Sequence, residues 1–158
     1  MIKNRVIATV SVILLIDQIS KIYVVQYLNL KEKLSIDVIS PVLNFKMAWN
    51  QGINFGLFDS GGELSRLILI TLSLIISVAL LWWIRKSNNA WRQSCVALIV
   101  GGALGNMTDR IVFGAVADFL NMSCCGVQNP FSFNVADIAI FFGAFGLIIW
   151  DKNENLIT

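Results

Sequence analysis

Four long apolar runs constrain this chain more than any other feature of its sequence. A membrane-spanning helix needs about 20 mainly apolar residues to cross roughly 30 Å of hydrocarbon, and such runs lie at about residues 6–28, 64–84, 91–113 and 131–150. With 56% hydrophobic residues, 14% charged residues and a mean hydropathy of +0.72, the chain has too few polar side chains to cover a soluble domain of this size. We therefore predict an all-α integral membrane protein with four transmembrane helices.

At 158 residues the chain predicts a single domain, residues 1–158. The longest polar connection is residues 29–63. Within it, LSIDVISPVLNFKMAWN alternates weakly between apolar and polar residues, which predicts a small β subregion of short strands or an interfacial patch.

Basic residues predict the orientation of the spans. Lys3 and Arg5 precede the first span, and the short connection RKSNNAWR, residues 85–92, holds three more basic residues. Basic residues in short loops favour the cytoplasmic side, so both termini are expected there, and residues 29–63 and 111–134 outside. The net charge of +2 is too small to indicate a nucleic-acid partner.

The residue types that are missing narrow the possible chemistry. The sequence contains no histidine, which excludes Ser-His-Asp and Cys-His nucleophile systems and argues against the usual zinc site. No metal or cofactor is therefore expected. Cys95 lies within a span. The adjacent Cys124 and Cys125 can bridge only with strain, so we interpret this pair as incidental or redox-labile; in an oxidising outer compartment the alternative is a bridge that stiffens the loop.

Asp17 and Lys21 lie one helical turn apart and so share a face of the first span. We interpret them as a structural ion pair, with Lys21 reaching toward the membrane interface. Ser20 is next to Lys21 in sequence and points elsewhere, which argues against a Ser-Lys dyad. In GGALGNMTDR, residues 101–110, the glycine spacing predicts close helix contact and the final Asp-Arg predicts pairing or capping.

Asp118 and Asp137 remain as the candidate reactive groups, because one follows the third span and the other begins the fourth. Two neighbouring carboxylates share a proton, so that one acts as a base and the other as an acid. Such a pair suits peptide hydrolysis. The same acids also suit a proton-coupled transporter, or polar contacts between helices in a non-catalytic assembly factor.

Five sequence blocks occur in an order that resembles lipoprotein signal peptidase, also called signal peptidase II. They are DQISK at 17–21, NQGINFG at 50–56, GGALGNMTDR at 101–110, VADF at 116–119 and FNVAD at 133–137. The blocks extend over nearly the whole chain, and their combination is far more specific than any one of them.

That resemblance implies an aspartic endopeptidase of the bacterial cytoplasmic (inner) membrane with its active site at the outer face. Its substrates would be diacylglyceryl-modified prolipoproteins, cut just before the lipidated cysteine by a monomer that also contacts membrane lipid. The resemblance implies Asp118 and Asp137 as the catalytic pair. The other matching positions, expected to bind substrate or support the site, are Asp17, Lys21, Asn50, Gly52, Gly105, Asn106, Asp109, Arg110 and Asn134.

Two features depart from the family pattern. Ile53 and Asn54 stand where the family commonly has small residues, and the segment between the two aspartates carries Cys124 and Cys125. The first departure concerns the local loop conformation, and neither departure involves Asp118 or Asp137.

Overall fold

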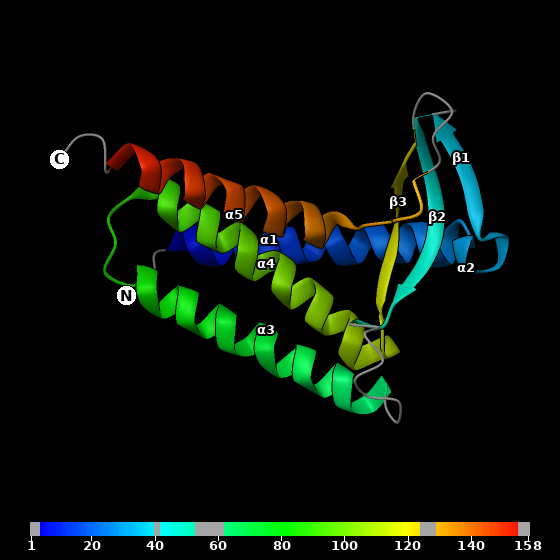
Figure 1. The fold of residues 1–158 in the computed structure, drawn as a ribbon, viewed down its shortest axis with the longest axis horizontal. Coiled ribbons are helices and arrows are strands. Elements are labelled where there is room, and N and C mark those ends of the chain that lie inside the picture. Colours follow the sequence, from blue (N-terminus) through cyan, green and yellow to red (C-terminus); the bar gives the residue numbers. More distant parts are fainter. Residues whose placement is uncertain (1–3, 40–41, 53–61, 124–128, 155–158) are drawn as a thin grey trace.

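A computed structural model describes residues 4–39, 42–52, 62–123 and 129–154. The chain is mostly helical, with a small sheet at one end of the helices (Figure 1). The long helices are α1 (Asn4–Lys21), α3 (Gly62–Ile84), α4 (Ala90–Phe113) and α5 (Val135–Glu154).

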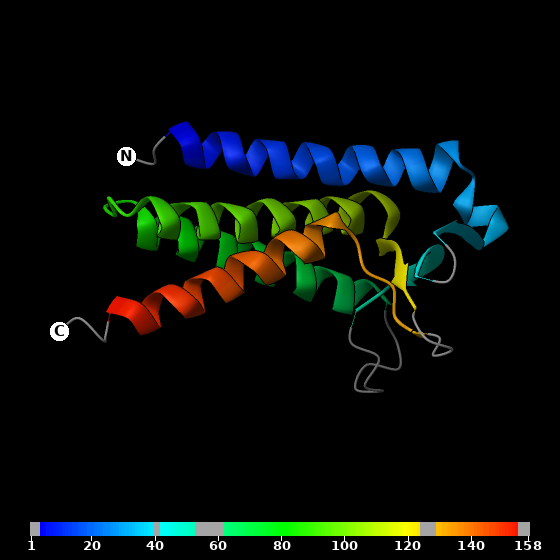
Figure 2. The same ribbon diagram turned by 90° about the horizontal axis from the view of Figure 1, so that it is seen from above.

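Helix α4 is the centre of the helical part, because it packs against α1, α3 and α5 (Figures 1 and 2). Its glycines permit this close approach. A Cβ atom added to Gly101 would lie 2.8 Å from Cβ of Ile13 in α1, and one added to Gly102 would collide with the Ala136 carbonyl of α5. The predicted small-residue helix contact is therefore present, and it serves two neighbours of α4 at once.

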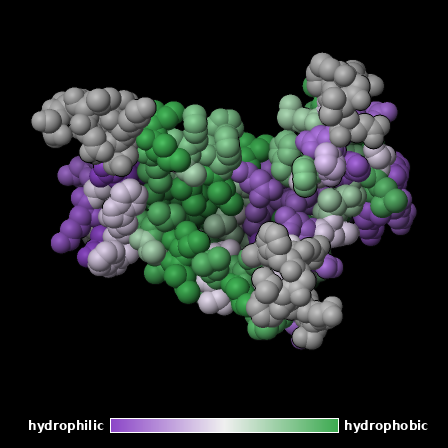
Figure 3. Space-filling model, in the orientation of Figure 1, coloured by the Kyte–Doolittle hydropathy of each residue, from purple (hydrophilic) through white to green (hydrophobic). Residues whose placement is uncertain are grey.

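Three helices of the described residues are long and apolar enough to cross a membrane: Asn4–Tyr27, Glu63–Ile84 and Ala90–Phe113. The surface over the helical part forms a hydrophobic band, with hydrophilic surface on both sides of it (Figure 3). The fourth predicted span, 131–150, differs from the prediction. Phe133 pairs with Leu120 in extended conformation, so α5 begins only at Val135, and its apolar part, Val135–Ile149, is shorter than the other three spans.

The first span also ends differently from an ordinary α-helix. Helix α1 continues into the π-helix η1 (Ile22–Tyr27), and the short helix α2 (Leu30–Lys33) follows. Asn29 and Leu34, on either side of α2, have positive φ angles of 57° and 63°. The chain thereby turns sharply out of the helical part and into the sheet.

The sheet contains β1 (Ser35–Ile39), β2 (Leu43–Asn50) and β3 (Val116–Met122), antiparallel and in that order. The strands predicted within 29–63 are present, but β3 is a strand where a loop was expected. Val24, Leu30 and Phe119 form a buried cluster that holds the sheet against η1 and α2. Ala48 of β2 is opposite Asp118 of β3, so this packing fixes one candidate acid.

Several sequence predictions concern residues outside the described ranges. Cys124 and Cys125 are among them, as are Ile53 and Asn54 of the NQGINFG block. Cys95 is buried in α4 as a free thiol.

Candidate functional site

Asp118 and Asp137 are brought together by one asparagine. The Asn134 side-chain amide donates to Oδ1 of Asp118 over 2.6 Å, and its Oδ1 accepts from the backbone N–H of Asp137 over 2.9 Å. Asn134 is fully buried. The strand that carries one acid and the helix that carries the other are therefore joined through a single side chain.

Asp137 is fixed at the first turn of α5 by reciprocal capping. Oδ2 of Asp137 accepts from the backbone N–H of Asn134 over 3.2 Å, while Asn134 caps the Asp137 N–H in return. The Asn106 amide of α4 donates to Oδ1 of Asp137 over 2.8 Å. Asp137 is thus oriented by three contacts and remains half-buried, so that part of it stays accessible.

Asp118 is buried, with 3% of its surface exposed, and its second oxygen accepts from the Asn50 side-chain amide over 3.1 Å. Burial, followed by the negative charge of Asp137, raises the pKa of Asp118 from 3.8 to about 6. The negative charge of Asp137 therefore favours the protonated form of Asp118. A pair of this kind can hold one proton and act as acid and base together.

A second charged cluster lies beside the pair. Nζ of Lys21 lies 2.7 Å from Oδ2 of Asp17 and 2.7 Å from Oδ2 of Asp109. The ion pair between Asp17 and Lys21 is present as predicted, but the prediction that Lys21 reaches toward the interface is wrong. Only 4% of Lys21 is exposed, because a second carboxylate, from α4, holds it inside.

Gln18 belongs to this cluster and was not singled out from the sequence. Its side-chain amide donates to Oδ2 of Asp17 over 3.1 Å and to Oδ1 of Asp109 over 2.9 Å. Its position inside the DQISK block was the only signal available. Gly105 makes room for the cluster, since an added Cβ would lie 2.6 Å from Oδ2 of Asp17.

The remaining candidate residues lie around the pair. Arg110, in the last turn of α4, donates from Nη1 to the Asn106 carbonyl over 3.3 Å, and its buried Nε has no hydrogen-bond partner among the described residues. Gly52 has a φ of 100°, and its N–H donates to Oδ1 of Asn50 over 3.0 Å. That turn holds the Asn50 amide toward Asp118.

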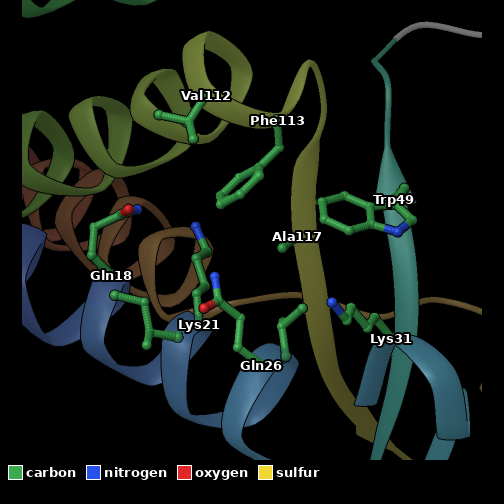
Figure 4. Close-up of a pocket in the computed structure, with 10 residues that line it drawn as sticks. Gln18, Lys21, Gln26, Lys31, Trp49, Val112, Phe113 and Ala117 are labelled. Carbon is green, nitrogen blue, oxygen red and sulfur yellow. The ribbon is translucent and has the colours of Figure 1, made fainter. Parts of the chain in front are cut away.

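A cavity of about 470 Å³ lies on the other side of the charged cluster, next to Ala117 of β3. Figure 4 shows Gln18 and Lys21 on one wall, Val112 and Phe113 on the wall opposite, and Trp49 and Lys31 at the far side. Neither acid of the pair lines this cavity. Within the described ranges, the acids and thiols form no group of three or more that could hold a metal ion.

Comparison of the sequence with known proteins finds one family and several relatives whose names agree with each other. The sequence model of the family described as signal peptidase (SPase) II matches residues 9–151. A lipoprotein signal peptidase of Pelagibacter ubique is 41% identical over 140 residues, which cover 87% of this chain and 81% of that protein. One of Methylobacterium radiotolerans is 40% identical over 111 residues, and this alignment covers 70% of this chain and 64% of that relative, slightly under two thirds of its length.

Solved structures show the same similarity. A chain described as a bacterial membrane enzyme, determined by the in meso method at 1.9 Å resolution, matches with a TM-score of 0.77 and 29% identity over 92% of this chain and 90% of that chain. A second structure with the same description, at 2.3 Å resolution, matches with a TM-score of 0.77 and 26% identity.

Proposed function

Because this chain belongs to the signal peptidase II family, we propose that it removes signal peptides from diacylglyceryl-modified prolipoproteins, cutting just before the lipidated cysteine. The membership rests on the family match over residues 9–151, and it confirms the resemblance carried by the five sequence blocks. The observation that carries the reaction type is the coupled pair, Asp118 and Asp137, held together by Asn134.

The pair supports an aspartic peptidase mechanism. The ionised carboxylate takes a proton from a water molecule as the water oxygen bonds to the scissile carbonyl carbon. The protonated carboxyl gives its proton to the carbonyl oxygen and so neutralises the developing negative charge. When the tetrahedral intermediate collapses, the C–N bond breaks, a proton passes to the leaving amine, and the released signal peptide keeps the new carboxyl group.

The raised pKa of Asp118 supports a division of roles within the pair. A carboxyl with a pKa of about 6 keeps its proton at a pH where an ordinary aspartic acid has lost it. We assign the shared proton to Asp118 and the base to Asp137, which the Asn106 amide and the Asn134 N–H stabilise as an acceptor.

Two side chains next to the pair, those of Asn50 and Arg110, are assigned supporting roles in the reaction. Asn50 is exposed and donates to Asp118, so its amide lies where a peptide backbone would approach. Arg110 keeps an unpartnered buried Nε in the last turn of α4. We assign Asn50 a substrate contact, and Arg110 the electrostatic balance of the two acids.

The proposed topology places the reaction at the outer face of the bacterial inner membrane. Helix α5 serves as the fourth span, running beside α4 in both views (Figures 1 and 2). Both termini are then cytoplasmic, and the sheet lies outside. A membrane-anchored substrate meets the pair where water enters, and a single domain acting as a monomer suffices.

Mass spectrometry of the cleavage products tests this function. The purified chain in detergent, mixed with a diacylglyceryl-modified prolipoprotein, is expected to release a signal peptide that ends one residue before the lipidated cysteine. The same prolipoprotein without its diacylglyceryl group is the matched control and is expected to be cut poorly. An intact modified substrate, or a cut at another bond, would overturn the proposal.

A further inference from the structure

Lys21 contacts neither Asp118 nor Asp137, yet it is connected to both. Its single ammonium group lies 2.7 Å from Asp17 and 2.7 Å from Asp109, two carboxylates from different helices. All three side chains are buried, with at most 4% of their surface exposed. A buried charged group of this kind needs close partners of opposite charge. Here both partners, Asp17 and Asp109, also accept a hydrogen bond from the backbone.

Each of the two carboxylates holds a backbone N–H next to one acid of the pair. Oδ1 of Asp17 accepts from Ala136 over 2.9 Å, and Ala136 immediately precedes Asp137. Oδ2 of Asp109 accepts from Ala117 over 3.1 Å, and Ala117 immediately precedes Asp118. The ammonium group therefore joins two carboxylates, each of which anchors the backbone before one acid of the pair.

A third connection runs through Asn106. Its Oδ1 lies 3.4 Å from Nζ of Lys21, and its amide donates to Asp137 over 2.8 Å. The same Oδ1 accepts from the Asn134 amide, which also donates to Asp118. Lys21 is thus joined to both acids through hydrogen bonds alone.

From these contacts we propose that Lys21 is a positioning residue, whose ammonium group sets the separation of Asp118 and Asp137 by holding the two carboxylates that anchor the backbone before each acid. This inference rests on the proposed function, since it concerns the geometry of the reacting pair. It differs from simple charge neutralisation, because a neutralising cation needs only to be near Asp17 and Asp109, whereas a positioning cation must bind both of these carboxylates at once.

The separation matters because coupling between two charges falls with distance. If Asp17 and Asp109 hold the backbone less firmly, the carboxyls of Asp118 and Asp137 share their proton less strongly. The rising and falling limbs of the pH–rate profile then move closer together. The charged groups near the pair that remain in place are Asp17 of α1 and Asp109 and Arg110 of α4. Misplaced reacting groups also reduce kcat steeply while binding changes little.

The test uses the full-length chain in detergent and the modified prolipoprotein. Lys21→Met removes the ammonium group and keeps an apolar side chain of similar length. We expect kcat to fall by about 100-fold and KM to change much less. The ammonium charge also lowers the pKa of Asp118, so its removal by itself moves the high-pH limb to higher pH, and the approach of the two limbs is therefore measured in Lys21→Arg, which keeps the charge. Lys31→Met is the matched control, because Lys31 lines the same cavity at its far side, is exposed, and is expected to leave all three quantities unchanged.

Lys21→Arg covers the case in which Lys21→Met does not fold. It retains the positive charge, but a planar guanidinium cannot occupy one point between two carboxylates, so the positioning role predicts a reduced kcat and a shifted pH profile here too. A folded Lys21→Met or Lys21→Arg with wild-type kcat and an unchanged pH profile would refute the inference. A wild type that leaves the prolipoprotein intact would instead refute the proposed function.

Discussion

Replacement of Asp118 by asparagine is expected to make the protein more stable at pH 8. Asp118 is buried, and its pKa is raised from 3.8 to about 6 by burial and by the charge of Asp137. An acid with a raised pKa in the folded state stabilises the fold while it is protonated, below pH 3.8. That stability is lost as the pH rises through about 6. Asparagine carries no charge and avoids this loss.

The magnitude follows from the pKa shift. The difference between about 6 and 3.8 is roughly two units, and at about 1.36 kcal/mol per unit it amounts to about 3 kcal/mol at pH 8. Against this, the new amide faces the donors of Asn50 and Asn134 and loses one hydrogen bond, at a cost of about 1 kcal/mol at every pH. The net gain is therefore about 2 kcal/mol at pH 8, and near pH 3 it becomes a loss of about 1 kcal/mol.

Thermal unfolding in detergent at pH 8 and at low pH measures this effect. For a chain of this size, about 2 kcal/mol corresponds to a Tm increase of roughly 4–8 °C. Asp37→Asn is the control, because Asp37 is an exposed acid of β1, and its replacement is expected to leave Tm unchanged at both pH values. An Asp118→Asn protein that is no more stable than wild type at pH 8, with a difference that does not vary with pH, would refute the reasoning.

Two further predictions concern the surroundings of the pair. Gly105→Ala places a Cβ 2.6 Å from Oδ2 of Asp17, so we expect a loss of about 2 kcal/mol in stability and slower cleavage, measured by Tm and product formation; an unchanged protein would contradict the close packing of α4 on α1. Asn50→Ala removes a hydrogen bond that lowers the pKa of Asp118, so the high-pH limb of the cleavage profile is expected to move to higher pH; a shift to lower pH would contradict the assignment of the proton to Asp118.

The sequence predicted those parts of the fold that depend on local patterns. Apolar runs of sufficient length predicted α1, α3 and α4, and weak alternation predicted β1 and β2. Strand β3 was missed because it is almost fully buried, so that its burial does not alternate, and because it is stabilised by β2, which lies far away in sequence. The start of α5 was misplaced because the pairing of Phe133 with Leu120 is likewise non-local.

In the site, too, local contacts could be predicted from the sequence and contacts between distant segments could not. The ion pair of Asp17 and Lys21 followed from helical spacing, whereas the second partner of Lys21, Asp109, depends on how α1 packs against α4. Gln18 was missed for the same reason. The backbone donors of Ala117 and Ala136 have no sequence signal at all, because any residue except proline supplies an N–H.

The most direct measurement of the central claim is the cleavage rate of the modified prolipoprotein by wild type, Asp118→Asn, Asp137→Asn and the control Asp37→Asn, with folding checked by Tm. We expect wild type and Asp37→Asn to cut just before the lipidated cysteine, and both pair variants to remain folded and to lose nearly all activity. Asp118→Asn is the more informative of the two variants. It is expected to be more stable than wild type at pH 8 and still inactive, so that its loss of activity cannot be due to unfolding. Substantial cleavage by either folded pair variant would contradict the mechanism.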